Sequence, residues 1–243
     1  MTAFPYKNSR QSKKKQIEEM FDNISPRYDL LNHLLSLNID KLWRKNAINK
    51  LKAFNPQKIL DVATGTADFA IAATRIENVS VTGIDISEGM LNIARKKIVG
   101  KKLSHRIELL KADSENMPFG NNTFDAVTVG FGVRNFENLE KGLSEILRVL
   151  KSGGIFIVLE FSKPENRPFK QLYYFYFTKI LPFFGKIISK DNSAYTYLPE
   201  SVKTFPSGND FLEILRKAGF INTVCYRQTF GIASIYFAQK PGV

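Results

Sequence analysis

The sequence has very few residues of the kinds that build covalent cross-links or metal sites. There is one cysteine, Cys225, and there are two histidines among 243 residues. A single cysteine excludes an internal disulfide and the zinc sites built from paired cysteines. The sequence also shows no apolar leader segment and no uncharged apolar run of the roughly 18 residues that a membrane-spanning helix needs. We therefore expect a cytoplasmic protein that holds no metal.

Acidic residues are scarce relative to basic ones. The 23 Asp and Glu residues stand against 35 Lys and Arg residues, which gives a net charge of +12 and a pI near 9.6. Such a balance favours polyanionic partners, either nucleic acid or an anionic membrane surface, and composition alone does not choose between them. The hydrophobic fraction of 44% suffices for a packed core and excludes a disordered or collagen-like chain.

Short β-rich runs alternate with helical patterns in the middle of the chain. Five strands are predicted there, at 58–62, 79–84, 106–110, 124–129 and 155–159, and helical stretches at 67–76 and 90–98 follow the first two. This alternation favours βαβ units with parallel strands. A helix at 207–218 and two further strands, at 220–226 and 232–238, come last. The predicted fold is therefore α/β, with a doubly wound, mostly parallel seven-stranded sheet, Rossmann-like in kind, that ends in an antiparallel hairpin.

The predicted sheet follows a helical N-terminus and is interrupted by an insert. Apolar residues recur at helical spacing between residues 17 and 51, with a break near Ser25-Pro26. The basic residues before them, Lys13 and Lys14 among them, are expected in a mobile arm or a solvated first helical turn. The predicted division is a basic arm and helical lid, residues 1–50, and a sheet domain, residues 51–243, with an insert at about 163–206.

Polar residues follow the first three predicted strands, at the edge where a doubly wound sheet binds its ligands. Asp61 and Gly65 lie around the first turn, Asp85 ends the second strand, and Asp113 and Ser114 follow the third. A glycine lets the backbone approach a ligand, and a carboxylate at position 85 can accept both hydroxyl hydrogens of a ribose. The first turn lacks the GxGxxG pattern that seats a pyrophosphate, so we predict an adenosine-containing cofactor without phosphates. The alternatives are an ordinary turn for Gly65 and a helix cap for Asp85.

Longer motifs restrict the class of cofactor-binding protein further. They are residues 61–68, 21–29 with Trp43 behind them, 117–119 with 130–136, 148–164 and 195–201. Together they resemble the S-adenosylmethionine-dependent class I methyltransferases and, more narrowly, the menaquinone/ubiquinone biosynthesis C-methyltransferases, over about residues 16–238. The resemblance implies S-adenosylmethionine as the cofactor, with contacts at Thr66, Asp85, Asp113, Ser114 and Gly130. The family commonly has a histidine where this chain has Asp40, so a catalytic histidine is not carried over to that position.

The resemblance also implies the acceptor, which in the family is the reduced ring of a polyprenylated demethylquinone. Its carbon beside a ring hydroxyl becomes nucleophilic as the hydroxyl loses its proton, so the enzyme needs a group that stabilises the oxygen or takes the proton. Arg134 and Asn135 follow the fourth strand and offer a positive charge and a neutral donor, and Tyr28 with Asp29 can close over the site from the lid. The predicted catalytic residues are Arg134, Asn135 and Tyr28. The alternatives are a loop-anchoring ion pair, a helix cap and structural packing, and neither histidine is proposed as a base.

The insert contains an aromatic segment, residues 169–184, with eight Phe or Tyr residues in sixteen positions and basic residues around it. Aromatic side chains with basic neighbours suit a segment that lies on a membrane. We therefore predict an anionic membrane surface as a partner, with peripheral association at the inner face of the cell membrane. A core helix and a homodimer contact are the alternatives.

The sequence thus predicts S-adenosylmethionine-dependent C-methylation of demethylmenaquinol to menaquinol, in menaquinone biosynthesis. Methylation of a methoxy-benzoquinol in the ubiquinone pathway is the nearest alternative, because the same site would serve both. A nucleic-acid methyltransferase belongs to another class; the charge allows it, but no Asn/Asp-Pro-Pro-aromatic motif is present, and we expect no nucleic-acid partner. A non-catalytic cofactor-binding protein is the last alternative, against which Asp85, Arg134 and Asn135 argue.

Overall fold

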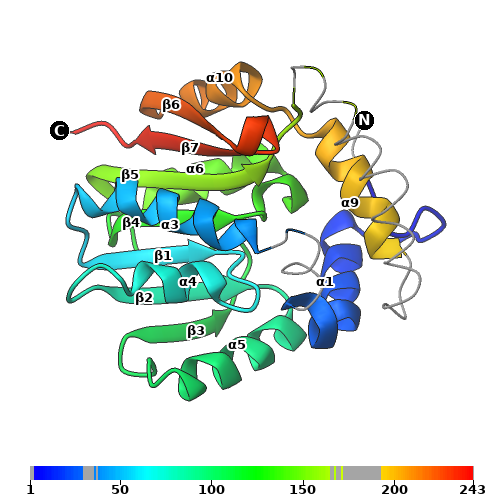
Figure 1. The fold of residues 1–243 in the computed structure, drawn as a ribbon, viewed down its shortest axis with the longest axis horizontal. Helices are drawn as coiled ribbons and strands as arrows, with labels where there is room; N and C mark the ends of the chain where they lie inside the picture. The colour runs from blue at the N-terminus through cyan, green and yellow to red at the C-terminus, as the bar shows by residue number, and fades with distance from the viewer. Residues whose placement is uncertain are drawn as a thin grey trace.

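The computed structural model describes residues 3–29, 36, 38–164, 167, 171 and 193–242, which form a seven-stranded sheet with helices around it (Figure 1). The strands are β1 (Lys58–Val62), β2 (Ser80–Asp85), β3 (Ile107–Lys111), β4 (Phe124–Gly130), β5 (Leu150–Phe161), β6 (Ile221–Gln228) and β7 (Ala233–Gln239). Their order across the sheet is β3-β2-β1-β4-β5-β7-β6, and β7 runs antiparallel to both β5 and β6. The predicted doubly wound, mostly parallel sheet with a C-terminal antiparallel hairpin is confirmed.

Successive strand residues point to opposite sides of the sheet, so the apolar strands give it two apolar faces. Helices cover both faces. Ile59 of β1 packs in one apolar cluster with α3 (Ile39–Lys52), α4 (Asp68–Ala73) and α5 (Glu88–Gly100). Its neighbour Leu60 packs in a second cluster with α6 (Leu139–Val149) and α10 (Asn209–Lys217). This double burial explains why the central strands read as nearly continuous apolar runs in the sequence.

A helical lid lies beyond the carboxyl ends of the parallel strands. It consists of α1 (Lys13–Ile24), the short helix η1 (Ser25–Arg27) and α9 (Ser193–Thr204) (Figure 1). A third apolar cluster joins Ile17 and Met20 of α1 to Met90 of α5 and Tyr197 of α9. The helix break expected near Ser25-Pro26 is confirmed by η1.

The lid approaches α5 closely at Gly89. A Cβ atom at this position would lie 2.9 Å from Ser25 Oγ and 3.1 Å from the Cα of Asp22. Asp22 Oδ1 accepts hydrogen bonds from the Ser87 hydroxyl, at 2.6 Å, and from the Gly89 N–H, at 2.9 Å. The carboxylate thus sits at the N-terminus of α5, where the helix dipole favours negative charge.

One expectation about the N-terminus is wrong. Helix α1 begins at Lys13, and this lysine is 5% exposed instead of solvated. Lys14 is also engaged, in ion pairs with Asp113 and Glu115. A net charge computed from the sequence does not show which lysines are solvated. Here Lys13 and Lys14 bind segments that follow strands of the sheet and so hold the lid in place.

The aromatic segment 169–184 lies, apart from position 171, outside the described residues, so its predicted role stays a prediction. Within the described part of the chain, no helix is long and apolar enough to cross a membrane. The same residues contain no group of three or more His, Cys, Asp or Glu side chains that could hold a metal ion.

Candidate active site

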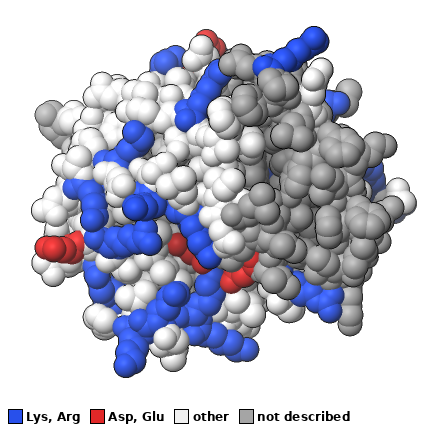
Figure 2. Space-filling model, viewed as in Figure 1, with Lys and Arg blue, Asp and Glu red and all other residues white. Residues whose placement is uncertain are grey.

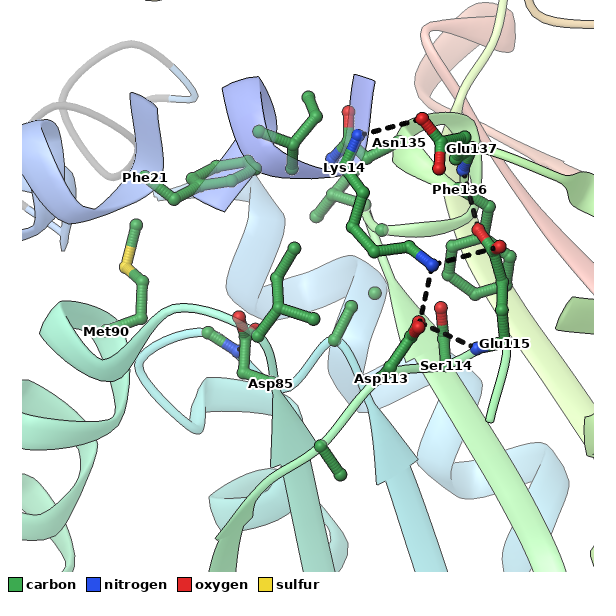
Figure 3. Close-up of a pocket in the computed structure, with 18 of the residues that line it drawn as sticks. Lys14, Phe21, Asp85, Met90, Asp113, Ser114, Glu115, Asn135, Phe136 and Glu137 are labelled. Atoms are coloured by element: carbon green, nitrogen blue, oxygen red, sulfur yellow. Dashed lines mark hydrogen bonds and ion pairs between the residues drawn. The ribbon is translucent and has the colours of Figure 1, made fainter. Parts of the chain in front are cut away.

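A pocket opens at the carboxyl ends of β1 to β4, beneath the lid (Figure 3). Its floor comes from the segments that follow four strands, and α1 forms the wall above it. Five of the seven predicted cofactor residues line it: Gly65, Asp85, Asp113, Ser114 and Gly130. The other two, Asp61 and Thr66, line a smaller pocket that adjoins the first and shares Gly65 and Gly130 with it. The topology therefore brings all seven residues to one edge of the sheet.

Asp85 is a buried carboxylate in the wall of this pocket. Its Oδ2 accepts a hydrogen bond from the Gly65 N–H, at 2.8 Å, and its Oδ1 accepts one from the Ser87 N–H, at 2.9 Å. Burial raises the pKa of Asp85 to about 6, although these backbone hydrogen bonds act in the opposite direction. The helix-cap alternative is wrong, because Ser87 is the N-cap of α5 and its hydroxyl accepts from the Met90 N–H.

Gly65 has a positive φ of 55°, and a Cβ atom added there would meet no protein atom within 4 Å. The left-handed backbone conformation therefore favours glycine at this position, and the absence of a side chain keeps the pocket open at this point. Asp61 lies deeper and accepts hydrogen bonds from the hydroxyls of Thr64 and Thr128, both at 2.6 Å. Burial raises the pKa of Asp61 to about 6 against the effect of these two donors.

Two lysines of α1 join the lid to the site, and of these Lys14 lines the first pocket. Neither was predicted as a site residue from the sequence. Lys14 Nζ lies 2.7 Å from Asp113 Oδ2 and 3.2 Å from Glu115 Oε2 (Figure 3). Lys13 Nζ donates to the carbonyl oxygen of Phe136, at 2.7 Å, and to that of Arg134, at 3.2 Å. Burial lowers the pKa of Lys13 to about 8, although nearby carboxylates oppose the shift. Each lysine thus joins the lid to a segment that carries site residues.

A second pocket lies on the other side of an aromatic wall. The two pockets share Phe21, Tyr28 and Phe131. The second pocket is lined mainly by apolar and aromatic side chains from the lid, α3 and the ends of β4 and β5. Its described lining residues are Met20, Phe21, Ile24, Tyr28, Ser36, Asp40, Trp43, Arg44, Phe131, Arg134, Phe161, Ala194, Tyr197 and Leu198. A molecule here and a molecule in the first pocket would meet at the shared wall.

Arg134, a predicted catalytic residue, lines the second pocket and forms a buried ion pair. Its Nη1 lies 2.7 Å from Glu160 Oε1, with the two side chains 7% and 0% exposed. Its guanidinium also lies 5.6 Å from the centre of the Phe161 ring. The loop-anchoring ion pair is therefore present, and Arg134 also lines the pocket, with its guanidinium against the ring of another lining residue, Phe161.

Asn135 and Tyr28, the other two predicted catalytic residues, lie at the junction of the pockets. Asn135 lines the first pocket, and its Oδ1 accepts a hydrogen bond from the Tyr197 hydroxyl at 3.0 Å. It is not a helix cap, because Asn138 caps α6. Tyr28 lines both pockets, and its neighbour Asp29 accepts a hydrogen bond from the Thr66 hydroxyl. The structure therefore places Tyr28 in the lining of both pockets and Asp29 beside them, and their role in catalysis stays a prediction.

Asp40 and Arg44 also line the second pocket, although neither was predicted as a site residue from the sequence. They form an ion pair one turn apart on α3, with side chains only 4% and 11% exposed. The Ser36 hydroxyl donates to Asp40 Oδ1 at 2.6 Å. The spacing of four residues is visible in the sequence, but it is equally typical of a solvated helix face.

The residues of the first pocket and its neighbour fit S-adenosylmethionine. Asp85 presents a carboxylate for the ribose hydroxyls, and Asp113 and Ser114 supply an acceptor and a donor for the adenine edge. The adjoining pocket is polar and includes Arg44 and Asp61, whose charges are opposite to those of an amino-acid carboxylate and ammonium. The aromatic wall between the two main pockets suits the positive sulfonium.

Comparison with known proteins decides the family. The model of the ubiE/COQ5 methyltransferase family matches residues 9–240. The chain belongs to this family. The predicted methyltransferase enzyme with S-adenosylmethionine as its methyl donor is thereby confirmed, as is the resemblance seen in the motifs.

Relatives of this methyltransferase cover nearly its whole length. It is 49% identical to demethylmenaquinone methyltransferase of Bacteroides fragilis over 97% of this chain and 96% of the relative. It is 45% identical to the ubiquinone/menaquinone biosynthesis C-methyltransferase UbiE of Geobacter sulfurreducens, over 94% and 90% of the two chains.

Solved structures agree with the fold. The [4+2]-cyclase SpnF matches with a TM-score of 0.67 and 20% identity over 96% of this chain and 98% of the other. Phospholethanolamine N-methyltransferase 2 of Haemonchus contortus, which was solved with S-adenosylhomocysteine, matches with a TM-score of 0.58 and 20% identity over 81% of this chain and 52% of the other. At these identities the matches establish the class I fold alone.

Proposed function

We propose that this methyltransferase methylates a ring carbon of demethylmenaquinol and so produces menaquinol. The observation that carries the proposal is the pair of pockets that meet at Phe21, Tyr28 and Phe131. One pocket carries groups for an adenosyl cofactor, and the other is an aromatic-lined cavity for a flat ring. The names of the relatives from Bacteroides fragilis and Geobacter sulfurreducens support this substrate class.

The residues of the site position the two reactants and exclude water. Bound S-adenosylmethionine supplies an electrophilic methyl group, which the acceptor carbon attacks in line with the departing sulfur. Arg134 is placed to hold negative charge on a ring oxygen, because its guanidinium faces the second pocket while Glu160 fixes its position. Asn135, held by Tyr197, and Tyr28 border the shared wall, where they can orient the ring toward the first pocket.

The test is a methyl-transfer assay with the purified protein under anaerobic conditions. Demethylmenaquinol, a methoxy-benzoquinol of the ubiquinone pathway and RNA are each offered with S-adenosylmethionine carrying a labelled methyl group. We expect methylation of demethylmenaquinol to exceed that of the benzoquinol by about tenfold or more, because the larger ring fills more of the aromatic pocket. A reversed order favours the ubiquinone-pathway alternative, label in RNA favours the nucleic-acid alternative, and no transfer to either quinol contradicts the proposal.

We also propose that the protein works as a peripheral protein on an anionic membrane, where a polyprenylated substrate resides. Withdrawing a prenyl tail from the bilayer costs about 0.8 kcal/mol per CH₂ group, which favours reaction at the surface. Lys and Arg gather over the face that α3 and α5 form (Figure 2). The exposed ones on these helices and the turn after α5 are Lys41, Lys45, Lys52, Arg95, Lys96, Lys101 and Lys102. A homodimer, the other partner expected for the insert, stays a prediction.

Sedimentation with lipid vesicles tests the membrane proposal. We expect binding to vesicles that contain phosphatidylglycerol, none to vesicles of phosphatidylcholine alone, and loss of binding at high salt. The Lys96→Gln/Lys101→Gln variant should bind about thirtyfold more weakly, because each basic residue near the surface contributes about 1 kcal/mol. Arg216→Gln/Lys217→Gln, which alters two exposed charges on α10, is the matched control and should bind normally. Equal binding by the two variants would reject this face.

A further inference from the structure

The second pocket is lined by one carboxylate, Asp40, and by two arginines, Arg44 and Arg134. Asp40 and Arg134 both line it, and each is buried. Each also has a counter-ion of its own, Arg44 for Asp40 and Glu160 for Arg134. The two ion pairs come from different parts of the chain, α3 and the ends of β4 and β5. The pocket therefore holds a carboxylate and guanidiniums, fixed by their ion pairs, within a lining that is mainly apolar and aromatic.

Two aromatic rings in contact with each other lie between the two ion pairs. The rings of Phe131 and Phe161 lie 4.5 Å apart with an interplanar angle of 33°. The Arg44 guanidinium lies 5.7 Å from the centre of the Phe131 ring, and that of Arg134 lies 5.6 Å from the centre of the Phe161 ring. Trp43 packs against both rings, with centre distances of 6.3 and 6.4 Å. Each ion pair thus contacts one ring of a tilted pair, and the two rings form an apolar surface with a charged group at each end, which suits a flat substrate with a polar group on each side.

A carboxylate and a guanidinium select different partners. An ionised carboxylate only accepts hydrogen bonds, whereas a guanidinium only donates them. A reduced quinone ring carries two hydroxyls, each of which can donate or accept. An oxidised ring carries two carbonyls, which only accept, so it can satisfy Arg134 but leaves Asp40 facing another acceptor. Asp40 already accepts from Arg44 and Ser36, so a ring hydroxyl adds a charge-assisted hydrogen bond, whereas a ring carbonyl brings two acceptor oxygens together at this point. The pair of groups, Asp40 and Arg134, therefore discriminates between the two oxidation states.

We infer that Asp40 discriminates between the reduced and the oxidised form of the acceptor ring. It accepts a hydrogen bond from one ring hydroxyl while Arg134 binds the opposite oxygen. The inference rests on the proposed function for the identity of the ring. It assigns to Asp40 the role of a specificity-determining residue, which admits the nucleophilic quinol and rejects the quinone. The counter-ion Arg44 and the donor Ser36 hold the carboxylate in place.

The single tryptophan of the chain supplies a readout that does not depend on catalysis. Trp43 lines the same pocket, so its fluorescence should respond to a bound ring. The probes are 1,4-naphthalenediol and 1,4-naphthoquinone, titrated anaerobically into the full-length protein with S-adenosylhomocysteine present. We expect the wild-type protein to bind the diol at least about tenfold more tightly than the quinone, the size of effect typical of a hydrogen bond to a charged group.

The decisive variant is Asp40→Asn, because an amide can donate to a carbonyl as well as accept from a hydroxyl. We expect its preference for the diol to fall to about threefold or less, mainly through tighter binding of the quinone. In the methyl-transfer assay its KM for the quinol should rise about tenfold while kcat changes less. Asp40→Glu keeps the carboxylate and should keep the preference. Asp210→Asn, at an exposed carboxylate on α10, is the matched control and should behave as wild type.

The outcomes separate this inference from the proposed function. Equal binding of diol and quinone by the wild-type protein overturns the inference whatever the variants do, even if Asp40→Asn does not fold. An undiminished preference in a folded Asp40→Asn variant, judged by normal S-adenosylhomocysteine binding, overturns it as well. Absence of methyl transfer to any quinol, together with a diol preference that depends on Asp40, would contradict the proposed function. It would still support discrimination between the two oxidation states by Asp40.

Discussion

Replacing Asp85 with alanine is expected to weaken S-adenosylmethionine binding about 100- to 10,000-fold. The reason is the loss of two charge-assisted hydrogen bonds to the ribose hydroxyls, each worth about 1.5–3 kcal/mol. Asp85 lines the first pocket from the end of β2, and its carboxylate is already oriented by the backbone of Gly65 and Ser87. Isothermal titration calorimetry measures the change directly. Alanine at Asp210, an exposed carboxylate on α10, should leave the affinity unchanged and serves as the control.

The affinity for S-adenosylmethionine is also expected to depend on pH, because the Asp85 carboxylate titrates. Burial raises the pKa of Asp85 to about 6 from an ordinary value of 3.8, and only the ionised form accepts both ribose hydrogens. Cofactor affinity should therefore rise with pH up to about 6 and level off above about 7. Asp61 has a pKa of about 6 as well and lines the adjoining pocket, so alanine at Asp85 should remove only part of the slope. A wild-type affinity that is constant between pH 5 and 7 would contradict the assignment.

The effect of Asp85 on folding stability has the opposite sign. A folded-state pKa above the unfolded value means that the folded protein binds more protons. The stability contribution of this group is therefore fully present below about pH 3.8 and is lost as the pH rises through about 6. Cofactor binding and apo-protein stability thus respond to pH in opposite directions over this range, a pattern typical of a site that maintains a buried charge for its ligand.

Replacing Arg134 with methionine is expected to destabilise the protein by about 3–5 kcal/mol, because it leaves the Glu160 carboxylate buried without its counter-ion. The Glu160 side chain is 0% exposed, and burial already raises its pKa while Arg134 acts to lower it. Urea denaturation measures the loss. The matched control is Lys151→Met, which breaks an exposed ion pair with Asp125 that has an N–O distance of 2.6 Å. That change should cost less than about 1 kcal/mol.

A double variant separates the structural role of Arg134 from its proposed catalytic role. Arg134→Met/Glu160→Leu removes both charges and should recover most of the lost stability, because no unpaired buried charge remains. If Arg134 stabilises a ring oxygen, this stable variant should still lose about 100- to 1,000-fold in kcat. Recovery of activity together with stability would show that the guanidinium only anchors its loop. Equal stability losses in Arg134→Met and Lys151→Met would contradict the burial argument itself.

The cofactor side of the site could be predicted from the sequence because topology alone places it. Asp61, Asp85 and Asp113 lie at or beyond the ends of adjacent parallel strands, so any doubly wound sheet brings them to one edge. The acceptor side could not be predicted in the same way. Asp40 and Arg44 look like an ordinary ion pair on a helix surface, and only the packing of α3 against the ends of β4 and β5 turns them toward a cavity.

For the lid, too, side-chain contacts could not be predicted from the sequence. Helical spacing and the Ser25-Pro26 break were enough to predict the N-terminal helices of the lid, but not that Lys13 is buried and that Lys14 is half-buried in two ion pairs. Their acceptors are backbone carbonyls and carboxylates about 100 residues or more further along the chain. Local patterns carry no information about such partners, since a lysine has the same intrinsic preferences whether its ammonium group is solvated or buried.

By itself, the sequence determined the class of fold, the strand-end carboxylates and the family, because strand periodicity and turn chemistry are local properties that short segments express directly. Only the tertiary structure decided which charges meet. The scarcity of acidic residues, which first suggested a polyanionic partner, does not reveal that Glu115 and Glu160 are buried and are paired with a lysine and an arginine of distant segments. Ion pairing depends on distance in space, and that distance is fixed when the sheet places its strand ends beneath the lid.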